Sequence, residues 1–413
     1  PNRSGFIAAV EDMTKSAGET LAVGVLDIDQ FSATNDLFGH RYGDRILQAV
    51  AKRLASLSQA QCVAARIGDD TFGVIGPNEY VNPGRLTALF ARPLEIDRSG
   101  EQAVSACLGF SGVVHARKDG ETLLKEALTA LKRAKQVGHG QSLHFDGAMQ
   151  SESREHALLL HELKRDFGND RLFLAFQPQV DLASGRVIAF EALLRWRTED
   201  GQLIAPDRFI PLAEQTGLIV DIGTWVVRRA LQAAKMLQES GHPDLRVAVN
   251  LSPAQLRQPP FVSVVESELV AADVQPSQLE LEVTESVSVL GQSLVIDRLK
   301  RLGDLGITIA IDDFGTGYSS LSYLDQLTAN RLKIDRSFVS GNTSGDDDFS
   351  IAAMIIDLAR RLDMHTVAEG IETAAQARTL LAMGCEEAQG YYFARPMPQE
   401  DLLDWLEHHN NAL

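Results

Sequence analysis

The chain has 413 residues, a formal net charge of −17 at pH 7, 45% hydrophobic residues and 23% charged residues. We expect two domains, since this length exceeds what one hydrophobic core usually organises, and the composition is that of a globular protein. The acidic excess argues against nucleic acid as a partner, because phosphate backbones are bound by clustered Lys and Arg.

The sequence predicts no membrane span, because no apolar run reaches the roughly eighteen residues that a bilayer requires. Residue 1 is Pro and no signal-like segment follows it. We therefore expect a cytoplasmic fragment of a longer protein, whose upstream part leaves room for a sensor or a membrane segment. The cysteines Cys62, Cys107 and Cys385 stand far apart, which predicts reduced structural thiols.

Residues 1–148 mix strands with amphipathic helices. Apolar runs predict strands at 21–29, around 62–76 and at 104–114. Residues 121–135 have the apolar spacing of a helix, which the following Gly138 ends. This mixture predicts an N-terminal α/β domain.

Residues 149–169 predict a connecting helix, with charged ends and a Leu-rich middle. Because no heptad repeats, we expect the leucines to pack on a neighbouring domain rather than in a coiled coil. These leucines are Leu158, Leu159, Leu160 and Leu163.

Residues 170–413 alternate short apolar strands with helical stretches such as 224–239 and 349–363. Repeated strand–helix units of this length predict a parallel sheet closed into a (β/α)8, TIM-like barrel. A turn at Ser184-Gly185 between the first two strands predicts one antiparallel pair, so we expect the barrel to be modified.

Polar side chains stand where seven of these strands end. The carboxyl ends of barrel strands converge on one mouth, which is where active sites lie. One such carboxylate could be a helix cap or an ion-pair partner, but seven strand ends together favour a functional site. The residues are Glu191, Asn250, Glu282, Glu285, Asp312, Asp313, Lys333, Asp335, Glu369, Glu372 and Gln389.

Oxygen ligands without Cys or His select Mg²⁺ or Mn²⁺ over Zn²⁺ or Cu²⁺. The carboxylates outnumber the needs of one ion, which predicts two ions about 3.5–4 Å apart. Such a pair would clamp the attacking and leaving oxygens of a phosphodiester, so we expect hydrolysis of a phosphate ester.

A set of short motifs between residues 170 and 405 resembles the EAL family of cyclic di-GMP phosphodiesterases. The order and spacing of the motifs make this resemblance specific, whereas the tripeptide EAL alone would mean nothing. The motifs are Glu191-Ala192-Leu193 with Leu194-Arg195-Trp196, Asn250-Leu251-Ser252, Glu282-Val283-Thr284-Glu285, DDFGTGYSSL (312–321), Lys333-Ile334-Asp335, Glu369-Gly370-Ile371-Glu372 and Gln389-Gly390-Tyr391.

The resemblance implies hydrolysis of cyclic di-GMP to linear pGpG by two-metal in-line attack. It also implies which oxygen donors bind the two ions, Mg²⁺ or Mn²⁺. These are Glu191, Asn250, Glu282 and Asp312 for the first ion, and Asp312, Asp313 and Glu369 for the second.

The resemblance further implies that Lys333 and Asp335 orient and help to deprotonate the attacking water. Glu369 is an alternative base, and the sequence leaves this choice open. Glu285 would hold the loop 312–317, whose glycines allow it to move.

Four residues are implied to contact the substrate, among them Arg195 through a phosphate. They are Gln177, Arg195, Glu372 and Gln389. Residues 318–324 resemble the dimerisation helix of the family and imply a homodimer through the EAL domain. No ligand position is missing, which favours an enzyme over the alternative, a receptor that binds cyclic di-GMP without cutting it.

Residues 1–6 and 21–54 resemble the opening of a GGDEF diguanylate cyclase domain. Asp27 matches a metal-ligand position, and Asn35 and Asp44 match the pair that recognises guanine. The signature itself is altered to Gly68-Asp69-Asp70-Thr71-Phe72.

Two alterations bear on catalysis. Asp69 places a negative side chain where backbone should approach a triphosphate, and Thr71 replaces a carboxylate of the metal cluster. Lys135 remains in place to meet phosphate, but His139 stands where an Arg is expected. The product-inhibition motif RxxD is absent, with Gln59 in place of its Arg.

We therefore expect a degenerate GGDEF domain that makes no cyclic di-GMP but binds GTP as a regulatory module. The alternatives are a pure scaffold and a bifunctional cyclase–phosphodiesterase. The residues expected to bind GTP are Asp27, Asn35, Asp44, Asp70 and Lys135.

Overall fold

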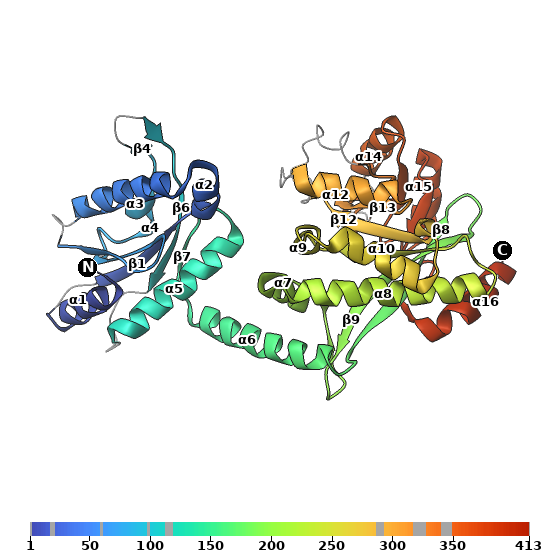
Figure 1. Ribbon diagram of the computed structural model, residues 1–413, viewed down its shortest axis with the longest axis horizontal. Coiled ribbons are helices and arrows are strands. Elements are labelled where there is room, and N and C mark those ends of the chain that lie inside the picture. Colours follow the sequence, from blue (N-terminus) through green and yellow to red (C-terminus); the bar gives the residue numbers. More distant parts are fainter. Residues whose placement is uncertain are drawn as a thin grey trace. The chain divides into compact units, whose positions relative to one another are not determined.

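A computed structural model of the chain describes residues 2–16, 21–57, 61–96, 100–111, 119–285, 293–316, 328–339 and 349–412. The chain divides into two compact units, Pro1–Leu158 and Leu159–Leu413, which Figure 1 colours from blue to teal and from green to red. The division falls within the helix that the sequence predicts to connect two domains.

The first unit is an α/β sandwich. Among the described residues its main sheet has the strand order β2-β3-β1-β6-β7, in which β1 is antiparallel to β3 and β6, and β7 is parallel to β6. The helices are α1 (Arg3–Ser16), α2 (Phe31–Phe38), α3 (His40–Ala55), α4 (Pro83–Ala88) and α5 (Gly120–Val137). The strands are β1 (Leu21–Ile28), β2 (Val63–Arg66), β3 (Thr71–Pro77), β4 (Leu94–Glu95), β5 (Glu101–Gln102), β6 (Ala106–Ser111) and β7 (Ser142–His144).

Strand β1 is buried along its whole length because helices cover both faces of the sheet. Leu26 packs on one face with Leu47 of α3, and Val25 packs on the other with Leu124 of α5. Figure 1 shows α3 and α5 on opposite sides of the sheet. The strand therefore carries Asp27, near its carboxyl end, into a dry environment.

The second unit is a modified (β/α)8 barrel, as the sequence predicts. Within the described residues eight strands close the barrel in the order β9-β11-β12-β13-β14-β15-β16-β8, and β8 pairs back onto β9. β8 is antiparallel to both of its neighbours, and the other pairs are parallel. The strands, including the short β10 and β17, are β8 (Leu172–Asp181), β9 (Val187–Arg197), β10 (Leu203–Ile204), β11 (Arg246–Leu251), β12 (Leu279–Thr284), β13 (Thr308–Phe314), β14 (Arg331–Ile334), β15 (His365–Ala368), β16 (Glu387–Gln389) and β17 (Met397–Pro398).

Helices surround these strands and cover their outer faces. They are α7 (Pro206–Thr216), α8 (Leu218–Glu239), α9 (Pro253–Leu256), α10 (Phe261–Ala272), α12 (Ser293–Asp304), α14 (Ser350–Arg361), α15 (Ala374–Met383) and α16 (Leu402–Ala412), with short 3₁₀ turns η3 (Pro276–Gln278), η4 (Arg336–Phe338) and η5 (Gln399–Asp401).

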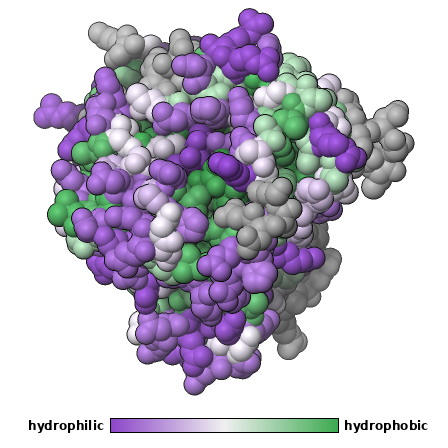
Figure 2. Space-filling view, turned by 90° about the vertical axis from the view of Figure 1, so that its right-hand side faces the viewer, coloured by the Kyte–Doolittle hydropathy of each residue, from purple (hydrophilic) through white to green (hydrophobic). Residues whose placement is uncertain are grey.

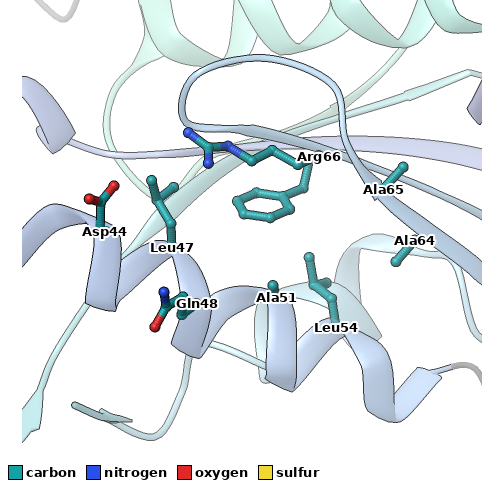
Figure 3. Close-up of a pocket in the computed structure, with 9 residues that line it drawn as sticks. Asp44, Leu47, Gln48, Ala51, Leu54, Ala64, Ala65 and Arg66 are labelled. Atoms are coloured by element: carbon teal, nitrogen blue, oxygen red, sulfur yellow. The ribbon is translucent and has the colours of Figure 1, made fainter. Parts of the chain in front are cut away.

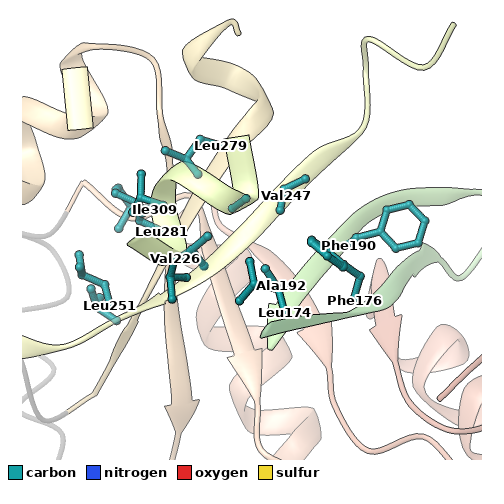
Figure 4. Packing of buried hydrophobic residues seen from close by; sticks show 14 of the residues in the cluster. Leu174, Phe176, Phe190, Ala192, Val226, Val247, Leu251, Leu279, Leu281 and Ile309 are labelled. Atoms are coloured by element: carbon teal, nitrogen blue, oxygen red, sulfur yellow. The ribbon is translucent and has the colours of Figure 1, made fainter. Parts of the chain in front are cut away.

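The apolar core of this unit lies between strands and helices rather than inside the barrel. Figure 4 shows Leu279 and Leu281 of β12 beside Val226 of α8. Because alternate strand residues face opposite sides, the intervening Glu280 and Glu282 point into the barrel. Polar side chains therefore fill the barrel interior.

Near the amino ends of the strands this polar interior is a neutral ion-pair layer. Arg246 donates to Glu280 at 3.0 Å and lies 3.6 Å from Glu387. Arg331 lies 3.2 Å from Glu280 and also pairs with Glu387. Two arginines and two glutamates thus close this end of the barrel without surplus charge.

Helix α6 (Gly147–Phe167) leads from the first unit into the second. Leu159 and Leu163 are buried in the core of the barrel unit, whereas Leu158 is 58% exposed. We expected all four leucines of this helix to pack on a neighbouring domain, and this is wrong for the exposed Leu158.

Within the described residues, no helix has the length and apolarity that crossing a bilayer demands. The face shown in Figure 2 is mostly hydrophilic, with smaller hydrophobic areas between the polar side chains. The cysteines at 62, 107 and 385 are all buried, and none of them forms a disulfide.

The ion-pair layer predicts a large stability effect for Arg331→Leu. Removing one arginine leaves Glu280 and Glu387 buried with a single cation, so we expect the free energy of unfolding of the barrel to fall by about 3–5 kcal/mol. Trp fluorescence during urea unfolding measures this unit alone, because all three tryptophans of the chain lie in it. The control is Arg361→Leu, which removes an exposed pair with Asp357 and should change stability by less than about 1 kcal/mol. Equal effects of the two substitutions would contradict a structural role of the layer.

Candidate active site

Lys333 is the centre of the carboxyl-terminal mouth of the barrel. Its side chain is 1% exposed, and its Nζ lies 2.7 Å from Glu282 Oε2, 2.7 Å from Glu369 Oε1, 3.1 Å from Asp312 Oδ1 and 3.8 Å from Glu191 Oε2. These residues lie on or just after β9, β12, β13, β14 and β15. The structure thus brings together residues that the sequence places at five separate strand ends.

Asp313 joins this cluster through an unusual backbone conformation. Consecutive strand residues normally face opposite sides, but Asp313 has a left-handed φ of 53°, and the pairing of β13 with β14 shifts register just there. Ligand oxygens of Asp312, Asp313 and Glu369 consequently lie within 4.8 Å of one another. Such strain in a non-Gly residue is typical of functional sites.

The cluster carries more negative than positive charge. Burial, together with neighbouring Glu191, raises the pKa of Glu282 well above its usual value. Burial also raises the pKa of Glu369 to about 8, although Lys333 opposes this rise. Despite its burial, the surrounding carboxylates hold the pKa of Lys333 well above its usual value. The ammonium is therefore charged but cannot neutralise all of its neighbours.

This donor set fits a divalent cation. Asp312, Asp313 and Glu369 offer carboxylate oxygens, and no His or Cys belongs to the group. Hard oxygen ligands are those that Mg²⁺ and Mn²⁺ prefer. A cation bound there would also relieve the charge excess.

Side-chain amides hold Glu191 in place. Asn250 Nδ2 donates to Glu191 Oε1 at 2.7 Å, and Gln389 Nε2 donates to Glu191 Oε2 at 2.6 Å. Gln389 also donates to Gln177 Oε1 at 3.0 Å, and Gln177 donates to the carbonyl of Ala394. The two glutamines expected to contact substrate are thus buried and linked to a carboxylate of the site.

Glu285 and Asp335 make local contacts at the edge of the cluster. Glu285 Oε2 accepts a hydrogen bond from the Gly315 amide at 2.9 Å, which is the contact that holding the loop 312–317 requires. Gly317 lies outside the described residues. Asp335 caps η4, where its Oδ1 accepts from the amide of Ser337 at 3.0 Å and from its hydroxyl at 2.5 Å.

A cavity of about 650 Å³ opens above the cluster. Its wall includes Gln177, Glu372 and Gln389, which were expected to contact the substrate. Three further polar side chains of the wall have no predicted role. These are Arg336, Ser337 and Tyr391. Tyr391 belongs to the motif Gln389-Gly390-Tyr391, but only the structure places it on the cavity wall.

Arg195 lines a neighbouring cavity of about 470 Å³, which shares Leu193 and Asn250 with the larger one. Burial lowers the pKa of Arg195 although Glu191 opposes this shift. The structure therefore places Arg195 beside the carboxylate cluster rather than over it.

The lower ion-pair layer and Gln179 escaped the sequence analysis. Gln179 is fully buried, and its Nε2 lies 3.5 Å from Glu282 Oε1. The sequence did contain a signal for these inward-facing side chains, because polar residues recur two positions apart in four of the strands. The pairs are 177 and 179, 280 and 282, 331 and 333, and 387 and 389.

In the first unit, Asp27 lies near the end of β1, and both of its carboxylate oxygens have partners. Lys135 Nζ lies 2.7 Å from Asp27 Oδ1, and Thr71 Oγ1 donates to Asp27 Oδ2 at 2.9 Å. Burial and neighbouring Asp27 raise the pKa of Asp70. Across the part of the chain that the structure describes, a group of three or more potential metal ligands occurs in the barrel alone.

Asn35 lies on α2 and Asp44 on α3. Asn35 Oδ1 is buried and has no hydrogen-bond partner among the described residues, and a Cβ added to Gly43 would lie 1.9 Å from it. Asp44 lines a cavity of about 320 Å³ together with Leu47 and Arg66 (Figure 3).

Comparison with known families agrees with this fold. Residues 160–396 match the model of the EAL domain, and residues 1–141 match the model described as "Diguanylate cyclase, GGDEF domain". The chain therefore belongs to the EAL family, as a tandem protein in which a GGDEF domain precedes the EAL domain. The resemblance to cyclic di-GMP phosphodiesterases at the family level is thereby confirmed.

Two curated relatives come from Pseudomonas aeruginosa. The bifunctional diguanylate cyclase/cyclic di-GMP phosphodiesterase MucR is 39% identical over 414 residues, which cover 98% of this chain and 60% of the relative. The cyclic di-GMP phosphodiesterase NbdA is 37% identical over 394 residues, which cover 94% of this chain and 50% of the relative. The chain thus spans little more than half of their length.

A solved structure of the PaMucR phosphodiesterase in complex with c-di-GMP is 44% identical. The matched region covers 59% of this chain and 99% of the solved chain, with a TM-score of 0.57.

The charge excess predicts that divalent metal stabilises the barrel. At Mg²⁺ concentrations about 100-fold above the dissociation constant, the gain is about 2.7 kcal/mol. Asp313→Asn should cut this gain by more than half, since it removes one ligand charge, while Asn tolerates the left-handed backbone. Thermal melts followed by Trp fluorescence, with and without Mg²⁺, measure both effects.

The matched control is Asp363→Asn, the same exchange at an exposed residue that is also left-handed (φ 58°). This variant should keep the full Mg²⁺-induced rise in melting temperature. An equal loss in both variants, or no rise in the unaltered chain, would contradict the site.

Proposed function

We propose that the barrel unit hydrolyses cyclic di-GMP to linear pGpG. The observation that carries the proposal is the ring of carboxylates around Lys333 at the floor of a cavity of about 650 Å³. Support comes from the printed activities of MucR and NbdA and from the c-di-GMP complex of PaMucR.

We propose two Mg²⁺ or Mn²⁺ ions as cofactors. The cluster holds five carboxylates, the four around Lys333 and that of Asp313. When all five are ionised, as metal binding requires, one ammonium leaves four surplus negative charges, which two divalent ions would balance. When bound, such ions supply Lewis acidity for attack on a phosphodiester. The proposed ligands are Glu191, Asn250, Glu282 and Asp312 for one ion and Asp312, Asp313 and Glu369 for the other.

Lys333 holds the carboxylates in position. A charged ammonium that donates to Glu282 and forms ion pairs with Asp312 and Glu369 has no lone pair with which to accept a proton. We therefore propose Glu369 or Asp335 as the base for the attacking water. Glu369 belongs to the cluster, and Asp335 lies at its edge.

Arg195 is proposed to bind a phosphate of the substrate. Glu372 is proposed to contact the substrate from the wall of the larger cavity. Gln177 and Gln389 line the same cavity and are also proposed to contact the substrate. Gln389 in addition orients Glu191, and Gln177 accepts a hydrogen bond from Gln389. Tyr391 offers a half-exposed ring, over which the guanidinium of Arg395 lies at 4.4 Å. Such an aromatic face suits a guanine base.

The direct test is incubation of the purified chain with cyclic di-GMP and Mg²⁺, followed by chromatography of the products. Linear pGpG is the expected product. Binding of cyclic di-GMP without any product would favour the alternative, a non-catalytic receptor.

Glu191→Ala should lower kcat by about 10³-fold or more, because it removes a metal ligand charge and leaves Asn250 and Gln389 without their acceptor. The measurement is initial-rate kinetics of pGpG formation. Glu268→Ala, which removes an ion pair with Arg228 away from the mouth of the barrel, is the control and should keep normal turnover. Near-normal turnover of Glu191→Ala would show that the metal assignment is wrong.

For the first unit we infer a GGDEF domain that is degenerate as a cyclase but binds GTP as a regulatory module. The pairing of Asp27 with Lys135 and Thr71 supports the loss of cyclase chemistry, because no group of three potential metal ligands forms there among the described residues. The unpartnered Oδ1 of Asn35 supports binding of a guanine donor. The name of MucR keeps a bifunctional enzyme as the alternative.

GTP should bind the chain, yield no cyclic di-GMP, and change phosphodiesterase activity by a coupling free energy of about 1–3 kcal/mol. Calorimetric titration and phosphodiesterase assays at increasing GTP measure the two effects, and Asn35→Ala should abolish both. No binding heat at millimolar GTP would leave the domain as a scaffold, and new cyclic di-GMP would show it to be a cyclase.

The homodimer also remains a proposal. Residues 318–324, which resemble the dimerisation helix, lie outside the described residues.

A further inference from the structure

Part of β9 extends beyond the closed barrel. β9 pairs with β11 only from Ala189 to Ala192, whereas residues 193–197 pair with β8 and β10 alone. On β8, residues 172–174 likewise pair only with β9 among the described strands. We call residues 193–197, with residues 172–174 of β8, the arm.

Arg195 lies at the middle of the arm, three residues beyond the last pair that joins β9 to β11. Glu191, by contrast, lies within the stretch that pairs with β11. The hydrogen-bond ladder of the barrel therefore fixes Glu191 but does not by itself fix Arg195. Other contacts must hold the arm in place.

Trp196 supplies those contacts. Its side chain is fully buried, and its ring packs edge-on against Phe209 of α7 with centroids 5.5 Å apart. Trp196 Nε1 donates a hydrogen bond of 3.0 Å to Asp166 Oδ2. Because Arg195 and Trp196 are adjacent in a strand, their side chains face opposite sides, and a shift of one moves the other.

Asp166 is 2% exposed and stands one residue before the end of α6. Its backbone carbonyl accepts from the amides of Asn169 and Arg171 at 3.1 and 3.2 Å. The carbonyl of Arg171 in turn accepts from the amide of Arg197 at 3.0 Å. Side chain and backbone of Asp166 thus both tie the arm to the end of α6.

Helix α6 is continuous from Gly147, in the first unit, to Phe167. We propose that Asp166 is a positioning residue, which fixes Arg195 through Trp196 and so couples the orientation of α6 to substrate binding. This rests on the proposed role of Arg195 in binding a phosphate of cyclic di-GMP. Asp166 itself lines neither cavity of the site.

The test is steady-state kinetics of the full chain with cyclic di-GMP. Asp166→Ala and Trp196→Phe should each raise KM about tenfold and leave kcat within about twofold, because phosphate binding is weakened equally in ground and transition states. Asp166→Asn keeps an oxygen acceptor for Trp196 and should retain a nearly normal KM. Lys164→Ala, on the exposed side of the same turn, is the control.

A double substitution separates positioning from general damage. If Asp166 acts through Arg195, then Asp166→Ala should raise KM no further in an Arg195→Ala background. Additive effects, or a normal KM in both Asp166→Ala and Trp196→Phe, would overturn the proposal. A normal KM in Arg195→Ala would overturn it as well, and would locate the error in the role of Arg195 rather than in the contacts of Asp166 with Trp196.

Folding is checked separately. Trp225 and Trp405 remain in Trp196→Phe, so Trp fluorescence melts can compare every variant. Should Asp166→Ala fail to fold, Trp196→Phe, which keeps the contact with Phe209, decides the outcome alone.

Discussion

Burial of four carboxylates around one ammonium is the constraint on which the barrel unit depends. Lys333 can neutralise only one of them. Burial raises the pKa of Glu282 and of Glu369. The layer below has equal numbers of arginines and glutamates. The same inward-facing strand positions therefore stabilise the fold at one end and leave an unsatisfied charge at the other. That charge is what a metal-dependent reaction on a phosphodiester requires.

The first unit shows how a similar arrangement loses this property. Asp27 also lies near the end of a buried apolar strand, but Lys135 and Thr71 satisfy both of its oxygens. Among the described residues no group of three potential metal ligands forms there, while Asn35 keeps an unsatisfied oxygen on the neighbouring helix. The two units thus place polar groups at strand ends by the same rule, and the local charge balance separates a proposed catalytic site from a proposed binding site.

Much of the barrel site could be predicted from the sequence because polar residues stand within or just after short apolar runs. The modified barrel and the convergence of Glu191, Glu282 and Asp312 follow from that pattern. The left-handed turn at Asp313 and the link from Gln389 to Glu191 could not be predicted, since both depend on contacts between strands distant in the sequence. For the same reason the position of Arg195 in a neighbouring cavity emerged only from the fold.

Anomalous diffraction from crystals grown with Mn²⁺ and without substrate tests the charge argument most directly. The account predicts two manganese peaks at the mouth of the barrel, one among Glu191, Asn250, Glu282 and Asp312 and the other beside Asp313 and Glu369. A mouth without manganese, or manganese bound at Asp27 in the first unit instead, would contradict it.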